Sequence, residues 1–245
     1  MPFVAGFLFI LQICFVIHVL KTGRDNFWIG IIMMLPGIGC AVYFFTQVLP
    51  DINQSNSANK MGNSLLKSVD PQRELRARKL ELERADTVEN RRKLAAECVE
   101  ANLPDDAIKL LEGCLKGRME SDPHLLLELA TAYFSADQFA KATTTLESLI
   151  EKNPDFKSHD GHLLYARSLE KNGASDKAIT EYETLAVSYP GEEARVRYAL
   201  LLKQLGRHDE ADKWFTESIT RAKRAPGYYR NKEKQWLKIA REQKA

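Results

Sequence analysis

Cysteine is scarce in this sequence of 245 residues, and the few cysteines are widely spread. They stand at Cys14, Cys40, Cys98 and Cys114, and none joins a histidine at the separation typical of zinc sites. Cys98 and Cys114 fall at helical positions expected to face inward, where a free thiol packs as a small apolar group. We therefore expect neither a disulfide scaffold nor a metal site. Unpaired thiols are also compatible with a reducing compartment.

Catalytic motifs are missing as well. The sequence has no glycine-rich phosphate loop and no partnered nucleophile. His162 and Tyr165 share a predicted helix face near Asp160, but a surface or packing role is the simpler interpretation of both. The net charge of +2 is too small to indicate a nucleic-acid partner. We predict a protein that is not an enzyme and needs no cofactor.

Charge is nearly absent from residues 1–50, which contain only three charged side chains. Two uncharged runs, 3–20 and 27–49, flank those charges, and each is long enough for a helix that crosses a membrane. A cleavable signal peptide is the alternative, but no basic residue precedes the first run and no Ala-x-Ala site follows it. The pattern predicts a transmembrane helical hairpin.

The rest of the sequence repeats a helical pattern. A small residue recurs at Ala107, Ala142, Ala178 and Ala211, with separations of 35, 36 and 33 residues. Such a residue lets two helices approach closely, and a proline some residues later stops the second helix. In the two central units the accompanying residues are Leu129, Ala130, Tyr133, Leu146 and Pro154, then Tyr165, Ala166, Leu169, Tyr182 and Pro190.

These units resemble the tetratricopeptide repeat (TPR), a 34-residue helix-turn-helix. The outer units depart from it, because Cys98 replaces the usual tyrosine and no proline ends the fourth unit, as terminal repeats often allow. The resemblance implies an all-α chain with a TPR-like α-solenoid of about four repeats. The predicted organisation is a transmembrane anchor (1–50), a flexible tether (51–69), an N-terminal capping helix (70–87), the repeats (88–224) and a C-terminal capping helix (225–245).

The resemblance also implies a binding surface. TPR arrays usually bind a protein or peptide in a concave groove lined by the first helix of each repeat. Arg167 and Lys203 are expected to hold a carboxylate there. The chaperone-type carboxylate clamp is absent, because Ala96 and Thr131 stand where asparagine would be needed. The expected groove residues are Arg92, Leu127, Thr131, Phe134, Leu163, Arg167, Leu200 and Lys203.

The N-terminal segment has a resemblance of its own. Its Lys-Thr-Gly-Arg, Phe-Trp-Ile, Leu-Pro-Gly-Ile-Gly and Tyr-Phe-Phe motifs, between Val16 and Asp51, are similar to the N-terminal hairpin of phospholipase-D-type cardiolipin synthases. The catalytic His-x-Lys-x4-Asp motif of those enzymes is absent. The resemblance implies a bacterial protein of the cell inner membrane with two spans, whose repeats lie on the cytoplasmic side.

Two functions follow as hypotheses. The first is a membrane-tethered TPR scaffold or adaptor, non-catalytic, with a protein or peptide in its groove and the lipid bilayer as a second partner. The alternative is a regulatory subunit of a membrane phospholipid-synthesising enzyme, paired through the transmembrane hairpin. A basic C-terminal stretch with Tyr228, Tyr229 and Trp236 suits anionic headgroups or a nucleic-acid backbone, of which lipid contact is the better fit. The alternative is a solvated helix whose aromatic residues cap the array. The oligomeric state cannot be predicted.

Overall fold

Every regular element in the computed structural model is helical within the residues that it describes, which are 2–22, 25, 27–35, 37–48 and 72–244. The chain divides into two compact units, Met1–Pro71 and Gln72–Ala245. The tether predicted at 51–69 and the helix start predicted at Asp70 and Pro71 lie outside the described residues.

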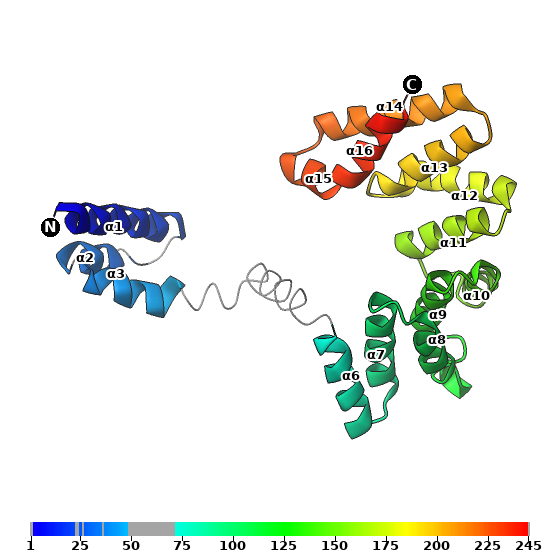
Figure 1. The fold of residues 1–245 in the computed structure, drawn as a ribbon, viewed down its shortest axis with the longest axis horizontal. Coiled ribbons are helices and arrows are strands. Elements are labelled where there is room, and N and C mark those ends of the chain that lie inside the picture. The colour runs from blue at the N-terminus through cyan, green and yellow to red at the C-terminus, as the bar shows by residue number, and fades with distance from the viewer. Residues whose placement is uncertain (1, 23–24, 26, 36, 49–71, 245) are drawn as a thin grey trace. The chain divides into compact units, whose positions relative to one another are not determined.

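The first unit contains α1 (Pro2–Thr22), α2 (Phe27–Met34) and α3 (Ile38–Tyr43), followed by a short π-helix over Phe44–Val48 (Figure 1). The second apolar run is therefore interrupted. Gly37, with φ of 92°, lies between α2 and α3 in a backbone conformation that favours glycine. The interruption leaves helices of 8 and 6 residues.

Polar side chains within this unit find partners across it. The Nε2 of Gln12 donates to the carbonyl oxygen of Ile32 at 2.7 Å, and the Nδ1 of His18 lies 3.0 Å from the Tyr43 hydroxyl. Val19, Ile32, Cys40 and Tyr43 form its small core. These contacts join α1 to both α2 and α3.

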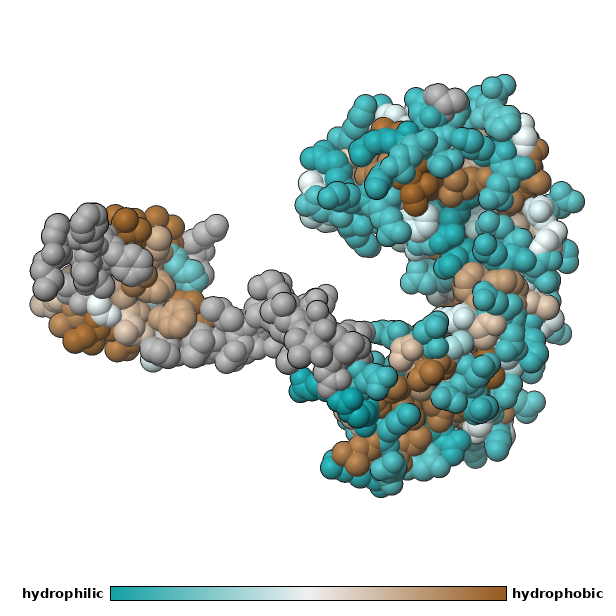
Figure 2. All heavy atoms as spheres, viewed as in Figure 1, coloured by the Kyte–Doolittle hydropathy of each residue, from teal (hydrophilic) through white to brown (hydrophobic). Residues whose placement is uncertain are grey.

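No helix in the described residues has both the length and the apolar character needed to cross a membrane. The prediction of a two-span inner-membrane protein, with its transmembrane hairpin over 1–50, is therefore wrong. A spanning helix needs about 20 apolar residues, and the break at Gly37 leaves much shorter pieces. Apolar side chains nevertheless reach the surface of this unit, such as Phe27 (73% exposed) and Met34 (85% exposed) (Figure 2).

The second unit is a series of helical hairpins that follow one another in chain order (Figure 1). Each helix packs against its partner in the hairpin, and each hairpin packs against the next. A 3₁₀ turn over Gly117–Met119 links the first two hairpins. The helices are α6 (Arg73–Arg84), then the pairs α7 (Val88–Glu100) with α8 (Pro104–Glu112), α9 (Pro123–Ser135) with α10 (Phe139–Lys152), α11 (His159–Lys171) with α12 (Ser175–Ser188), and α13 (Glu193–Gln204) with α14 (His208–Arg224), and finally α15 (Gly227–Lys232) and α16 (Lys234–Gln243).

The four recurring alanines lie where the hairpins close. Ala107, Ala142, Ala178 and Ala211 are all fully buried. Each stands near the start of the second helix of its pair, and a larger side chain there would push the two helices apart. The predicted all-α, TPR-like solenoid is thus confirmed for this unit, and the small residue recurs at the position that its spacing indicates.

The turn inside each hairpin also recurs. The residue five positions before each recurring alanine has a positive φ: Asn102 (59°), Asp137 (56°), Gly173 (78°) and Gly206 (78°). Helices commonly end on one such left-handed residue, and glycine, asparagine and aspartate adopt it at the lowest cost. Each pair of helices therefore reverses direction through the same local geometry.

Side-chain caps begin three of the first helices. The side chains of Thr87, Asp122 and Ser158 accept hydrogen bonds from the backbone N–H groups three residues later, at 3.2, 2.9 and 3.0 Å. Such caps satisfy N–H groups that have no partner in the helix. They fix where α7, α9 and α11 start.

Candidate binding face

Two pockets lie between helices of the second unit. One, of about 530 Å³, is lined by residues of α9 to α12, including Leu127, His162 and Glu181. The His162 Nε2 is 2.7 Å from a Glu181 carboxylate oxygen, so these two polar side chains already contact each other. The hydroxyl of Ser158 in the same pocket caps α11. The pocket holds no activated nucleophile.

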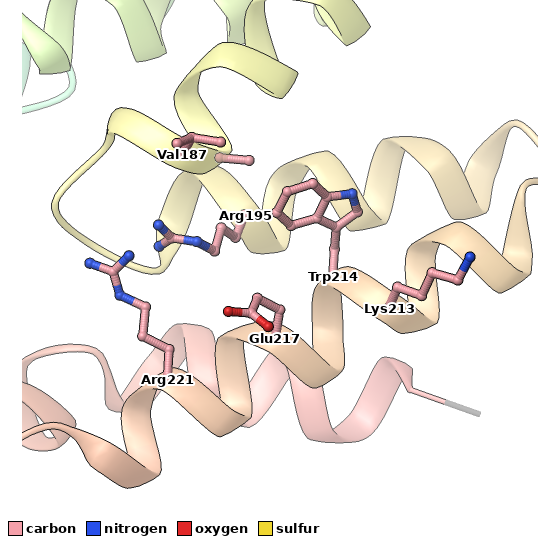
Figure 3. Close-up of a pocket in the computed structure, with 7 residues that line it drawn as sticks. Val187, Arg195, Lys213, Trp214, Glu217 and Arg221 are labelled. Carbon is pink, nitrogen blue, oxygen red and sulfur yellow. The ribbon is translucent and has the colours of Figure 1, made fainter.

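The other pocket, of about 540 Å³, lies between α12, α13 and α14. Figure 3 shows Arg195, Trp214, Glu217 and Arg221 around it. Arg195 and Arg221 lie 3.4 and 3.5 Å from the carboxylate oxygens of buried Glu192. These cations therefore have an internal counter-ion. Among the residues that the structure describes, no His, Cys, Asp or Glu side chains gather as a metal site would require.

The first helices α7, α9, α11 and α13 present a third surface, which we call the first-helix face. We define it by exposed and half-buried residues of these helices, namely Arg92, Leu127, Thr131, Phe134, Arg167, Arg197 and Leu200. Thr131 is exposed there, and Leu127, Phe134 and Leu200 are half-buried. Leu163, also expected in the groove, is 4% exposed and packs in the core, so it has little surface to offer a ligand.

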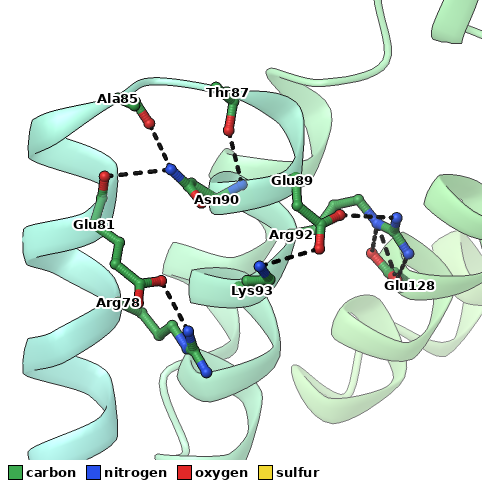
Figure 4. Close-up of polar contacts among 9 residues, drawn as sticks. All are labelled: Arg78, Glu81, Ala85, Thr87, Glu89, Asn90, Arg92, Lys93 and Glu128. Atoms are coloured by element: carbon green, nitrogen blue, oxygen red, sulfur yellow. Dashed lines mark hydrogen bonds and ion pairs between the residues drawn. The ribbon is translucent and has the colours of Figure 1, made fainter.

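Arg92 joins the first two repeats on this face. Two donors on one edge of its guanidinium contact the Glu128 carboxylate, Nη2 at 2.5 Å and Nε at 3.0 Å (Figure 4). The hydrogen bonds to Glu128 raise the pKa of Arg92, and burial opposes them. Glu89 lies on its other side at 3.5 Å. Arg92, predicted as a groove residue, therefore has its charge neutralised within the protein.

Arg167 differs sharply from Arg92. Its guanidinium lies over the Phe134 ring at 4.6 Å, which joins α11 to α9. Its Nε is buried and has no hydrogen-bond partner in the described residues. Burial lowers the pKa of Arg167, and the nearby Arg197 lowers it further, whereas Glu193 and Glu170 act in the opposite direction. The result is a partly desolvated cation without an ion pair among the described residues.

Arg197 is the next cation along the face, and sequence reasoning missed it. Its guanidinium lies over the Trp236 ring at 4.7 Å, and its Nε donates to Glu193 at 2.7 Å. Its neighbour Val196 is buried, whereas Arg197 lies three residues before the expected groove residue Leu200, on the same side of α13. That helical spacing was the available signal.

Lys203 was expected to share a carboxylate with Arg167. Instead its Nζ donates to the backbone carbonyl of Gln243 at 2.6 Å, which fastens α13 to the end of α16. The Gln243 side-chain oxygen lies 3.4 Å from the same Nζ. Arg197, rather than Lys203, is the cation whose charge acts on Arg167. The C-terminal helix therefore reaches the first-helix face through both Trp236 and Gln243.

The comparisons with known proteins agree with the helical-hairpin fold of the second unit. Two sequence models, each described as a tetratricopeptide repeat, match residues 99–160 and 163–228. A crystal structure of MamA is similar in fold, with a TM-score of 0.53 and 24% identity over 69% of this chain and 96% of that one. TTC0263, a thermophilic TPR protein of Thermus thermophilus, has a TM-score of 0.53 and 18% identity over 73% of this chain and 96% of its own. A search of curated proteins gave no match.

Proposed function

Because this chain is a tetratricopeptide-repeat protein, we propose that it is a non-catalytic scaffold that binds a protein or peptide on its first-helix face. The residues assigned to binding are Arg167 and Arg197, with Thr131 and Phe134 beside them. Neither the structure nor the comparisons support a membrane tether or a pairing with a phospholipid-synthesising enzyme. Those two hypotheses are therefore set aside.

The observation that carries the proposal is the character of this face from α9 to α13. Leu127, Phe134 and Leu200 are half-buried there and Thr131 is exposed. The guanidinium of Arg167 has no ion pair among the described residues. Many other apolar residues of the hairpins pack in the core, although Ile150 on α10 and Val187 on α12 are exposed. A partner that covers such a surface removes its partly exposed apolar side chains from water and can pair its unsatisfied polar group.

The alternative is a structural spacer that binds nothing on this face. A spacer needs only stable packing between hairpins, and it would tolerate a bulky charge anywhere on its surface. A binding face would lose affinity for its ligand if a bulky charged side chain were placed on it. Two exposed threonines provide the comparison. Thr131 lies on the first helix α9 and Thr180 on the second helix α12, and each hydroxyl donates to the carbonyl four residues earlier, at 2.8 and 3.2 Å.

The test uses peptide ligands selected by display against the full chain, with affinities measured by titration. We expect Thr131→Arg to weaken the selected ligands at least tenfold, because the long side chain occupies the face. The matched variant Thr180→Arg should leave the affinities unchanged. Equal effects of the two variants, or selected ligands insensitive to Thr131→Arg, would contradict the proposal. Circular dichroism and melting temperature control for folding.

A further inference from the structure

We propose that the first unit pairs with the same unit of a second copy of this chain, through the outward side of α1. The inference goes beyond the proposed function, because it concerns a different unit of the chain. Two chains joined in this way carry two first-helix faces. The surface, which we call the α1 outer face, is defined by the exposed residues Phe9, Ile10, Ile13, Cys14, Ile17 and Leu20.

The polar and apolar side chains of α1 are arranged in the opposite sense to those of a helix that faces water. Gln12 and His18 are the only residues between 3 and 20 whose side chains contain nitrogen or oxygen. Both contact the rest of the unit, Gln12 at the carbonyl oxygen of Ile32 and His18 at the hydroxyl of Tyr43. The α1 outer face is left with apolar side chains alone. A helix in water normally turns its polar side outward, so this face is expected to be covered.

The area of the face suits a protein partner. Its five largest side chains are each 45–63% exposed. Together they present on the order of 500 Å² of apolar surface, which is large for a patch left in water. A stable interface buries about 800 Å² on each partner, and about 65% of that area is apolar in homodimers. The α1 outer face therefore supplies about the apolar area that a homodimer needs.

The shape of the face favours pairing with an identical helix. Phe9, Ile13, Ile17 and Leu20 are three or four residues apart, so they form one ridge along about three turns of α1. α1 is continuous over 21 residues, whereas α2 and α3 have 8 and 6 residues and are separated at Gly37. A continuous ridge packs into the groove of a second helix. This selects α1, rather than α2 or α3, as the interface.

The lack of charge favours a second copy over a lipid surface. In a two-fold pair the same surface meets itself, so charged residues would bring like charges together. The α1 outer face has none. Helices that lie on a lipid surface carry lysine or arginine along a polar side. Residues 3–20 contain neither, and the polar side chains of Gln12 and His18 are bonded within the unit.

The first experiment uses the native cysteines of the full chain. Cys14 is exposed, whereas Cys40, Cys98 and Cys114 are buried. Cys14 stands near the middle of the α1 outer face, so the two copies of it lie close together whether the paired helices run parallel or antiparallel. We expect a short bismaleimide to link the chains into covalent dimers at micromolar concentration, and Cys14→Ser to abolish the link. A native chain that stays unlinked, or a Cys14→Ser chain that still links, would overturn the proposal.

Sedimentation velocity in detergent-free buffer measures the dimer without a cross-link. We expect Ile17→Glu to raise the dissociation constant roughly a hundredfold, because two-fold pairing places the added charge in the interface twice. Ile38→Glu is the matched control, since Ile38 is an exposed isoleucine of α3 outside the α1 outer face, and its dimer should persist. Circular dichroism checks the helix content of both variants. The cross-link of the native chain decides independently of them.

Three results would contradict the second copy as the partner. Equal weakening by Ile17→Glu and Ile38→Glu would show general apolar aggregation. A dimer that keeps its affinity in Ile17→Glu would place the interface elsewhere. A monomer in buffer that floats with phosphatidylcholine vesicles would show that a lipid surface covers the face instead. The proposed function is tested separately, through Thr131 and Thr180 of the second unit, so either proposal can fail without the other.

Discussion

The hydroxyl of Tyr229 donates a hydrogen bond of 2.7 Å to the carboxylate of Glu192, a side chain with no exposed surface. Tyr229 belongs to α15, and Glu192 directly precedes α13. The backbone N–H of Glu192 in turn donates to Glu233 at 2.9 Å. Arg195, itself buried, lies 3.4 Å from the Glu192 carboxylate and balances its charge. This buried network fastens the C-terminal helices to the fourth hairpin.

Tyr229→Phe should therefore destabilise the protein. The substitution removes the shorter contact of one oxygen of a buried carboxylate and leaves that oxygen with Arg221 at 3.5 Å, which costs about 1–3 kcal/mol. Chemical denaturation of the full chain measures the loss. Tyr228→Phe is the control, because Tyr228 is its neighbour and is 76% exposed, so its hydroxyl can bond to water. Equal stability of the two variants would show that the Tyr229 contact contributes nothing.

Alkaline pH should weaken the same unit. Burial, followed by a hydrogen bond to an acidic side chain, raises the pKa of Tyr133, Tyr189 and Tyr229 to about 12. An unfolded tyrosine has a pKa of about 10. The folded state therefore holds these protons more tightly, so its stability is fully present below about pH 10 and is lost as the pH rises toward about 12.

The measurement is the free energy of unfolding as a function of pH over that interval. Tyr133→Phe removes one of the three groups and should make the decline shallower. If the free energy of unfolding falls with pH at the same slope in the variant and the parent, folding does not raise the pKa of Tyr133. Absorbance of the tyrosine anions, followed over the same pH range, gives an independent record of when they ionise.

The spacing of the alanines was enough to predict the hairpins, because close approach of two helices admits only a small side chain. The same spacing holds for the turn residues Asn102, Asp137, Gly173 and Gly206, which the sequence analysis did not use. An asparagine, aspartate or glycine five residues before each alanine was a usable second signal. Burial of the alanine and the left-handed turn are local properties, so they leave a trace in the sequence.

Other features could not be read from the sequence, for physical reasons. The run from 27 to 49 is predicted as one helix because a membrane helix tolerates proline and glycine, so the Leu-Pro-Gly signal at the Gly37 break is discounted. Lys203 was assigned to a ligand because its acceptor, Gln243, lies 40 residues away in the chain. The proposed binding role of Arg197 depends on stacking against Trp236 from a separate helix. Such long-range contacts leave no periodic signal.

Gly173→Ala should test the importance of the recurring turn. No atom lies within 4 Å of the position that a Cβ would occupy, so crowding adds nothing to the effect. The cost arises from the positive φ of 78° alone and should be about 1–2 kcal/mol. Asp137→Gly, at a φ of 56°, should raise the stability or leave it unchanged, because glycine adopts a positive φ more readily than aspartate. Thermal unfolding of both variants provides the comparison.

Arg167→Met should leave stability unchanged or raise it slightly. The methionine keeps an apolar side chain against Phe134 and removes a half-buried charge that has no ion pair among the described residues. Arg197→Met is the contrasting variant, since it breaks the 2.7 Å contact with Glu193 and the stacking on Trp236. We expect it to cost about 1 kcal/mol. A larger loss for Arg167→Met would mean that Arg167 serves the fold.

The central claim is that the first-helix face is where a partner binds. Hydrogen–deuterium exchange of the full chain, with and without a display-selected peptide, tests it most directly. The account predicts that the ligand slows exchange in α9, α11 and α13 and leaves α10, α12 and α14 as they were. Protection confined to the second helices, or centred on the pocket beside Trp214, would contradict it.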